Sequence, residues 1–274
     1  MNKQDQNIKL QVLICTLGEA GIKRIVEAHH PNVPEVEYLV SWQLPDQDVE
    51  IPEELKRRRD FKIIKSNTIG IAINRNNAID NATAPIAIMT DDDVTYTKEE
   101  LLNVIKQHEY HPEADLITFK YASSQYPKIY PNNIFNLKNP PKGYYVTCFE
   151  ITFKTNKIKN RVSFNEHFGF HTTFHGGEED VFIYDAIKSG LNCIFIPNFL
   201  GTHNHSTTGD RDANKPESII TKGAIFYHTH KWTWPLRMLI HAYRQRRHNC
   251  SFSLLHYCRI WMEGMSKAIK KDIF

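Results

Sequence analysis

The 274-residue sequence has little excess charge and no apolar segment long enough to cross a membrane. Its 34 basic residues nearly balance 31 acidic residues, and a formal charge of +3 is too small to indicate a general nucleic-acid-binding protein. No apolar run approaches the roughly 18 residues of a membrane span. The polar start, residues 1–7, lacks the apolar core of a signal peptide. These absences predict a cytoplasmic protein that does not bind nucleic acid.

The sequence also has few cysteines, and they follow no disulfide or metal-binding pattern. The five cysteines form no CxxC pair: Cys15, Cys148, Cys193, Cys250 and Cys258. Neither a disulfide framework nor a cysteine zinc site is therefore indicated, and a reducing compartment fits this usage. Internal repeats and low-complexity segments are absent as well.

Apolar strand-like runs alternate with helical patterns along most of the chain. In order, these segments are expected at residues 10–15, 22–28, 38–42, 61–64, 71–82, 85–90, 144–152, 178–187 and 193–196. Strand and helix alternation of this kind predicts an α/β fold, with a mostly parallel central sheet flanked by helices. We expect one catalytic domain over residues 1–221.

The composition changes after residue 221. Two stretches place apolar residues on one helical face: Leu236, Leu239, Ile240 and Tyr243, and then Leu254, Cys258, Trp261 and Met265. Basic residues occupy the other faces: Arg237, Arg244, Arg246, Arg247, Arg259, Lys267 and Lys270. We therefore expect residues 222–274 to form a basic, amphipathic helical extension. Its apolar faces either pack on the catalytic domain or contact an anionic membrane, where apolar burial and charge attraction add.

Three consecutive aspartates, Asp91, Asp92 and Asp93, directly follow a buried strand. Ligands of open α/β sheets bind beyond the carboxyl ends of the strands, where Thr16 of the first strand also falls. Carboxylates this close repel one another unless a cation joins them, and their oxygens suit Mg²⁺ or Mn²⁺, which can also bind a diphosphate. The alternative is that the aspartates only cap the helix that begins near Thr97.

A second acidic cluster, residues 178–180, follows two glycines and begins a helix. Carboxylates in a first helical turn can simply favour the helix dipole. The glycines, however, allow a ligand to approach the backbone closely. Glu179 or Asp180 could then accept a proton from a sugar hydroxyl.

Two histidines, His203 and His205, follow the last expected strand. A histidine in a surface loop commonly has no such role, but an imidazole here could complete an oxygen-rich metal site. His203 is the first candidate because it lies closer to the strand end.

In this order and spacing, the motifs resemble family two of the inverting glycosyltransferases, over roughly residues 8 to 205. The resemblance implies the Rossmann-like GT-A fold. It also implies that the first strand ends at Thr16 in a loop that contacts the nucleotide. Gly70, Arg75 and Asn76 match the segment that leads to the diphosphate in that family.

The acidic clusters resemble two further motifs of the family. The aspartates match the Asp-x-Asp motif, which implies that Asp91 lies near the ribose and metal, that Asp92 belongs to the donor site, and that Asp93 binds the metal. The other cluster is similar to the Gly-Glu-Asp motif that holds the catalytic base. Counting from the glycine favours Glu179 as the base, whereas the Glu-Asp-hydrophobic pattern favours Asp180, which we prefer.

The resemblance implies a metal-dependent, inverting transfer of a sugar from a nucleotide-sugar to a glycan or lipid-linked glycan, as in bacterial surface-polysaccharide assembly. Mn²⁺ or Mg²⁺ would be the cofactor. A UDP-sugar is the first expectation for the donor, although residues 38–43 lack the aspartate that commonly reads uracil in this family. The extension would allow peripheral contact with the inner face of the cell membrane.

Two alternatives come from other functional classes. A nucleotidyltransferase acting on sugar phosphates would usually carry a phosphate loop rich in glycine and lysine, but residues 16–19, Thr-Leu-Gly-Glu, are poor in both. A non-catalytic carbohydrate-binding relative would need neither acidic cluster, and both are present.

Overall fold

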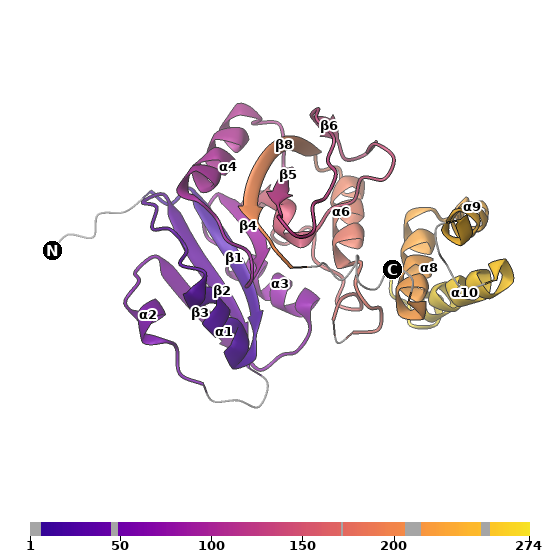
Figure 1. Cartoon of the computed structure of the whole chain (residues 1–274), viewed down its shortest axis with the longest axis horizontal. Coiled ribbons are helices and arrows are strands. Elements are labelled where there is room, and N and C mark those ends of the chain that lie inside the picture. Colours follow the sequence, from indigo (N-terminus) through magenta and orange to yellow (C-terminus); the bar gives the residue numbers. More distant parts are fainter. Residues whose placement is uncertain (1–6, 45–48, 171, 206–214, 248–252) are drawn as a thin grey trace.

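The computed structural model describes residues 7–44, 49–170, 172–205, 215–247 and 253–274, and the side chains of all of these except 245–247. An α/β unit occupies most of the chain, and three helices at the C-terminal end lie beside it (Figure 1). Among the described residues, no helix has the length and apolar character needed to cross a bilayer.

One eight-stranded sheet forms the centre of the α/β unit, in the order β3-β2-β1-β4-β7-β5-β8-β6. The strands are β1 Leu10–Leu17, β2 Val36–Gln43, β3 Phe61–Ser66, β4 Ile86–Asp91, β5 Leu116–Ala122, β6 Phe135–Asn136, β7 Ile151–Lys154 and β8 Cys193–Thr202. Strands β1 to β4 are parallel to one another and β5 is parallel to β8, whereas β6 and β7 are antiparallel to their neighbours. The expected mostly parallel sheet is confirmed.

Helices cover both faces of this sheet. The helical elements of the α/β unit are α1 Gly18–Glu27, α2 Glu53–Lys56, α3 Ile71–Asn81, α4 Lys98–Tyr110, the short 3₁₀ helix η1 Cys148–Glu150, α5 Thr155–Ile158 and α6 Glu178–Lys188. Alternate residues of β1 point to opposite faces: Leu10 and Val12 pack with α1 and α4, whereas Leu13 and Cys15 pack with α3 and α6. Because both faces are buried, the β1 sequence is almost continuously apolar.

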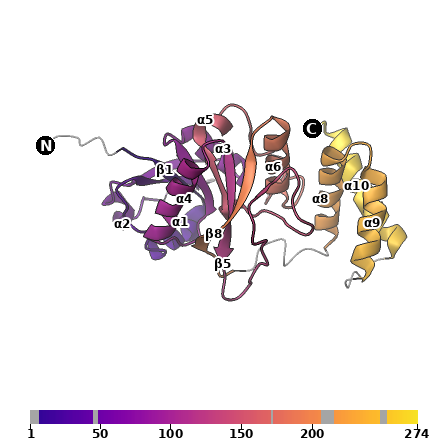
Figure 2. The same ribbon diagram turned by 90° about the horizontal axis from the view of Figure 1, so that it is seen from above.

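The C-terminal helices form a small bundle with its own core. They are α8 Pro216–Thr229, α9 Trp234–Arg247 and α10 Leu254–Lys270. Both Figure 1 and Figure 2 show α8 between α6 and the other two helices. Helix α8 begins at Pro216, whereas the sequence led us to place the start of the extension at residue 222. Tyr257 and Trp261 of α10 pack in the bundle core against Met238 and Ala242 of α9.

The two apolar stripes expected in the extension have different surroundings. The α10 stripe is packed: Trp261 lies in the bundle core, and Leu254 and Cys258 pack against that core. The α9 stripe, which begins at Leu236, is exposed instead, because α9 turns Met238 and Ala242 inward. The side chains of Arg246 and Arg247 lie outside the described residues.

Glycines allow α8 and α10 to cross at close range. A Cβ atom at Gly264 would overlap the carbonyl oxygen of Ile220, and one at Gly223 would overlap that of Trp261. Backbone atoms cannot move aside as a flexible side chain can. We expect Gly264→Ala to lower the free energy of unfolding by about 1–3 kcal/mol, as overpacking does, measured by urea denaturation. The exposed Lys270→Ala in the same helix is the control and should change it little.

Candidate active site

A cavity of about 750 Å³ lies beyond the carboxyl ends of β1 and β4. Strand pairing places Cys15 opposite Asp91, so these two strands end side by side. The cavity wall includes nearly all of the site residues expected from the sequence: Thr16, Gly70, Arg75, Asp91, Asp92, Asp93, Glu179, Asp180 and His203. The position fits the rule for open α/β sheets.

Each of the three aspartates has its own partners. Asp91 accepts a hydrogen bond from Arg75 (3.2 Å), whereas Asp92 is held by Arg24 (Nε–Oδ1 2.8 Å) and by the hydroxyl of Thr16. The third aspartate, Asp93, contacts His203. Asp92 thus links α1 to the end of β4, and the Thr16 hydroxyl takes part in the same contact.

Helix α4 does not use these aspartates as its cap. Thr97 accepts a hydrogen bond from the Glu100 backbone, and the Glu100 carboxylate accepts one from the Thr97 backbone in return. With this capping box complete, the aspartates are not needed to stabilise the start of α4. Helix capping therefore does not explain why the aspartates lie at the cavity.

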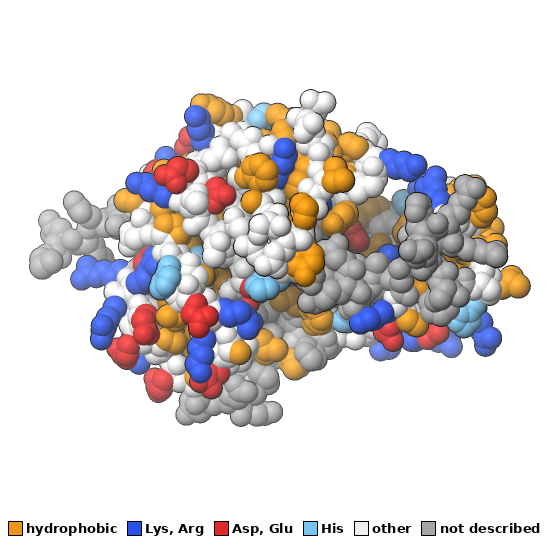
Figure 3. Space-filling view, in the orientation of Figure 1, with side chains coloured by type: hydrophobic (Ala, Val, Ile, Leu, Met, Phe, Trp, Pro, Cys, Tyr) orange, Lys and Arg blue, Asp and Glu red, His pale blue; other side chains and the backbone are white. Residues whose placement is uncertain are grey.

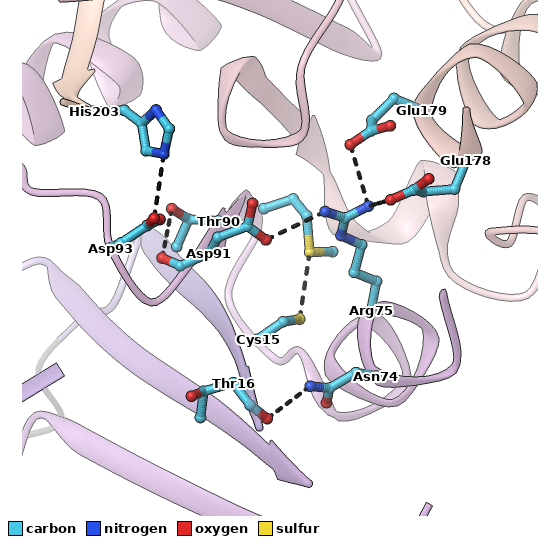
Figure 4. A network of polar contacts seen from close by, with 11 residues as sticks. Cys15, Thr16, Asn74, Arg75, Thr90, Asp91, Asp93, Glu178, Glu179 and His203 are labelled. Carbon is cyan, nitrogen blue, oxygen red and sulfur yellow. Dashed lines mark hydrogen bonds and ion pairs between the residues drawn. The ribbon is translucent and has the colours of Figure 1, made fainter. Parts of the chain in front are cut away.

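Asp93 and His203 form a pair across the cavity wall (Figure 4). His203 Nε2 lies 3.3 Å from Asp93 Oδ2. The His203 backbone donates to Ala122 (2.9 Å), and Thr95 pairs with Thr202 just before the histidine. Burial alone would raise the pKa of Asp93, but the hydrogen bond and charge of His203 hold that pKa below its usual range. The side chain of Asp93 is therefore an anion at neutral pH.

His205 lies next to this pair without joining it. The two histidine rings are 5.8 Å apart between centroids, and His205 is exposed whereas His203 is buried. Of the two candidates, the structure places His203 against an aspartate. Both rings line the cavity.

Arg75 connects the two acidic clusters, which are far apart in the sequence (Figure 4). It donates to Asp91 (3.2 Å), Glu178 (2.9 Å) and Glu179 (3.3 Å), and it is buried. Its guanidinium also lies 5.3 Å from the ring centroid of Phe164. The buried guanidinium of Arg75 thus contacts three carboxylates and holds the end of β4 and the start of α6 at the same cavity.

Desolvation at the cavity raises the pKa of both candidate bases. The pKa of Glu179 is raised to about 8 by burial and by Glu178, with Arg75 acting in the opposite direction. The pKa of Asp180 is raised to about 6, first by desolvation of its carboxylate at the cavity wall, although the residue as a whole is exposed, and then by Glu178, with Lys222 opposing. Glu178 thus opposes ionisation of both carboxyl groups, and the larger rise at Glu179 makes Asp180 the more readily ionised of the two.

Helix α8 forms one wall of the cavity, which the sequence analysis did not predict. Ser218, Thr221, Lys222 and Ile225 line the cavity at the spacing of one helical stripe. Gly177, which precedes α6 with φ of 82°, permits the contact, because a Cβ atom there would collide with Ile225. The i, i+3, i+4, i+7 spacing of these residues could have shown that they share one face of a helix. It could not have shown that this face lines the cavity.

Asn76 alone among the expected site residues does not line the cavity. It accepts a hydrogen bond from the Phe164 backbone nitrogen (2.7 Å) and donates one to the Phe164 carbonyl (2.9 Å). Neighbouring helical residues point about 100° apart, so Arg75 faces the cavity and Asn76 fixes the segment around residue 164. Its expected contact with the donor is not supported by this position.

The residues at the cavity can hold a divalent cation only in part. Within the described ranges, no three histidine, cysteine, aspartate or glutamate side chains are gathered as a complete metal site. Asp93 and His203 nevertheless converge there, with Asp91 beside them. A pair of protein ligands fits ions such as Mg²⁺, which usually take one or two carboxylates together with water and substrate phosphates.

The doubly covered sheet, with an acidic cavity at its strand ends, defines a GT-A-like α/β protein. A family model, Glycosyl transferase family 2, matches residues 35–183, which is more than half of the chain. The chain belongs to this family.

Solved structures with the same fold are only distantly related in sequence. TarS 1–349 of S. aureus, in complex with UDP-GlcNAc, is 15% identical with a TM-score of 0.61, and the match covers 96% of this chain and 73% of that one. The mannosyltransferase PcManGT of Pyrobaculum calidifontis, in complex with GDP-Man and Mn²⁺, is 14% identical with a TM-score of 0.55, and the match covers 97% and 77%. No curated protein sequence gives a significant match. At such identities the likeness shows the fold.

Proposed function

We propose that the protein transfers a sugar, with inversion, from a nucleotide-sugar to a hydroxyl of a glycan or lipid-linked glycan. The observation that carries this proposal is the Arg75 network, because it joins the Asp91 end of β4 to the acidic start of α6 in one cavity. Membership of the family supports sugar transfer. The UDP-GlcNAc and GDP-Man complexes of the structural neighbours support a nucleotide-sugar donor.

In this proposal, Asp93 and His203 hold Mn²⁺ or Mg²⁺, with Asp91 close to the ribose. The Mn²⁺ complex of PcManGT supports a divalent cation. When bound, the cation stabilises negative charge on the departing diphosphate. Asp93 and His203 are suited to holding it because their side chains converge at the cavity, with Nε2 and Oδ2 3.3 Å apart.

The proposed chemistry at the acceptor needs a base and no protein nucleophile. Asp180 takes the proton from the acceptor hydroxyl, whose oxygen forms a bond to the anomeric carbon while the bond to the diphosphate breaks. Attack from the face opposite the leaving group inverts the anomeric configuration. Glu179 is the alternative base, although its contact with Arg75 already engages one carboxylate oxygen.

Gln43 is proposed to contact the base of a UDP-sugar. It is buried at the end of β2 and lines the cavity. Its side-chain nitrogen donates to Thr68 (2.9 Å) and to the Gly70 carbonyl (3.1 Å), which uses both amide hydrogens. The remaining group of the amide is an acceptor oxygen, which suits the imide N–H of uracil. A glutamine can thus serve where the family commonly has an aspartate.

The proposed function is tested with a panel of UDP- and GDP-sugars in the presence of Mn²⁺. We expect calorimetry to detect binding of one donor class, with UDP-sugars binding most tightly, and turnover to release a nucleoside diphosphate only when an acceptor glycan is present. Pyrophosphate release from a nucleoside triphosphate and a sugar phosphate would instead identify a nucleotidyltransferase. Binding of glycans without any turnover would identify a non-catalytic relative.

The acceptor and the cellular site are proposed together. A glycan on a lipid carrier would be presented at the cytoplasmic face of the membrane, and bacterial surface-polysaccharide assembly requires such acceptors. The protein would then work in the cytoplasm, in peripheral contact with the membrane through its C-terminal helices. Helix α8 contributes one of the cavity walls, so the cavity lies next to the C-terminal helices.

A further inference from the structure

An exposed apolar stripe runs along α9 and the turn before it. The exposed fractions are 95% for Trp232, 63% for Leu236, 48% for Leu239, 41% for Ile240 and 55% for Tyr243. From Leu236 onward these residues follow the i, i+3, i+4, i+7 spacing of a single helical face. The bundle does not need this face for its own core, which α9 supplies with Met238 and Ala242.

The same part of the chain has charge of one sign. No acidic residue occurs between Glu217 and Glu263, and this segment contains seven basic residues: Lys222, Lys231, Arg237, Arg244, Arg246, Arg247 and Arg259. Figure 3 shows hydrophobic and basic side chains together at this end of the molecule. Lys231, Arg237 and Arg244 are themselves exposed beside the stripe. This sign of charge attracts an anionic surface.

We infer that the α9 stripe, defined as Trp232, Leu236, Leu239, Ile240 and Tyr243, is the docking surface for an anionic lipid bilayer. Apolar side chains would enter the interface while the flanking arginines contact lipid phosphates, so that the two contributions add. A second copy of the chain fits this surface poorly, because pairing two such faces would bring cations together without acidic partners.

Docking through α9 would also place the cavity near the membrane surface. Helix α8 lines the cavity through Thr221 and Lys222, and it packs against α9 and α10 through Ile219 in the bundle core. His228 of α8 also contacts Asp185 of α6 (2.8 Å). The stripe and the cavity are thus joined by one packed helix. This inference rests on the proposed membrane contact and identifies the surface that makes it, and it does not depend on the catalytic acids.

Vesicle sedimentation of the full chain tests the inference. Wild-type protein should sediment with phosphatidylcholine–phosphatidylglycerol vesicles at low salt, remain in the supernatant with phosphatidylcholine alone, and be released at high salt because the charges are screened. The triple variant Leu236→Ser, Leu239→Ser, Ile240→Ser should bind at least about tenfold less. Arg237→Glu with Arg244→Glu should lose at least about tenfold as well.

Matched controls change the same number of residues on the α/β unit. The apolar control is Ile129→Ser, Ile134→Ser and Phe199→Ser, all of which are exposed. The charge control is Lys138→Glu with Lys142→Glu. Both should bind vesicles like wild type, with unchanged circular dichroism for all variants.

Two results would overturn the inference. One is a lack of α9-dependent binding, seen either as wild-type protein that stays in the supernatant at low salt or as α9 variants that bind vesicles as well as their controls. The other is a dimer in light scattering that the α9 triple variant dissociates, since the stripe would then cover a second copy. Asp93→Ala should bind vesicles normally, so failure of the docking surface and failure of the proposed transfer are distinguished.

Discussion

Replacing Asp93 with alanine should reduce sugar transfer by about 10³ or more while leaving the fold intact. The large effect is expected because Asp93 is the proposed metal ligand, and charge stabilisation of the leaving group is a dominant contribution to catalysis. The fold should survive because the Asp93 side chain is partly exposed and contacts His203 at the cavity wall, outside the apolar core. Acceptor-dependent release of nucleoside diphosphate measures the first effect, and thermal unfolding measures the second.

Three controls define this result. His203→Ala should show a milder loss, because one of several ligands is removed. The exposed Asp80→Ala on α3 should leave turnover unchanged, and a chelator should abolish wild-type activity until Mn²⁺ is restored. Undiminished turnover in Asp93→Ala, or full activity with the chelator present, contradicts the metal-dependent mechanism.

The sequence predicts the location of the site because that location follows from strand ends. Thr16 and Asp91 terminate neighbouring parallel strands, and parallel strands end at one edge of a sheet. His203 lies at the end of β8, several strands away, and still reaches Asp93. Apolar runs that alternate with helical segments in the sequence were enough to predict these parallel strands.

Side-chain partners could not be predicted in the same way. Arg75 and Asn76 are adjacent, and both matched a family motif, but only Arg75 faces the cavity. Which of two neighbouring polar residues points inward depends on the rotation of α3 against the sheet, and the four successive polar residues 74–77 give no periodic signal to fix it. The binding of Asp92 by Arg24 is similarly a consequence of how α1 packs.

The C-terminal helices show the limit of amphipathic patterns. The stripes that begin at Leu236 and Leu254 both consist of apolar side chains, yet only the second packs against the bundle core. A pattern shows that a face is suited to burial and does not identify what buries it. The cavity wall formed by α8 escaped prediction for the same reason, since Thr221 and Ile225 could as well have faced their own bundle.

Replacing Asp180 with asparagine should lower turnover by about 10² or more with donor binding little changed. The amide keeps the shape of the carboxylate but cannot accept the proton. Glu179→Gln should have a smaller effect on the chemical step, because the raised pKa of Glu179 disfavours its ionised form and one of its carboxylate oxygens already contacts Arg75. Steady-state kinetics, with donor affinity measured separately by calorimetry, gives the ranking. The exposed Asp80→Asn serves as the isosteric control.

The pH dependence separates the two bases independently of mutation. A base acts only when deprotonated, so activity falls as the pH drops through its pKa. Desolvation at the cavity raises the pKa of Asp180 to about 6 and that of Glu179 to about 8. With Asp180 as the base, wild-type kcat/KM should rise with pH through about 6 and be nearly constant above neutrality. A rise centred near 8, together with a larger loss in Glu179→Gln than in Asp180→Asn, would assign the proton transfer to Glu179 and move the catalytic register by one residue.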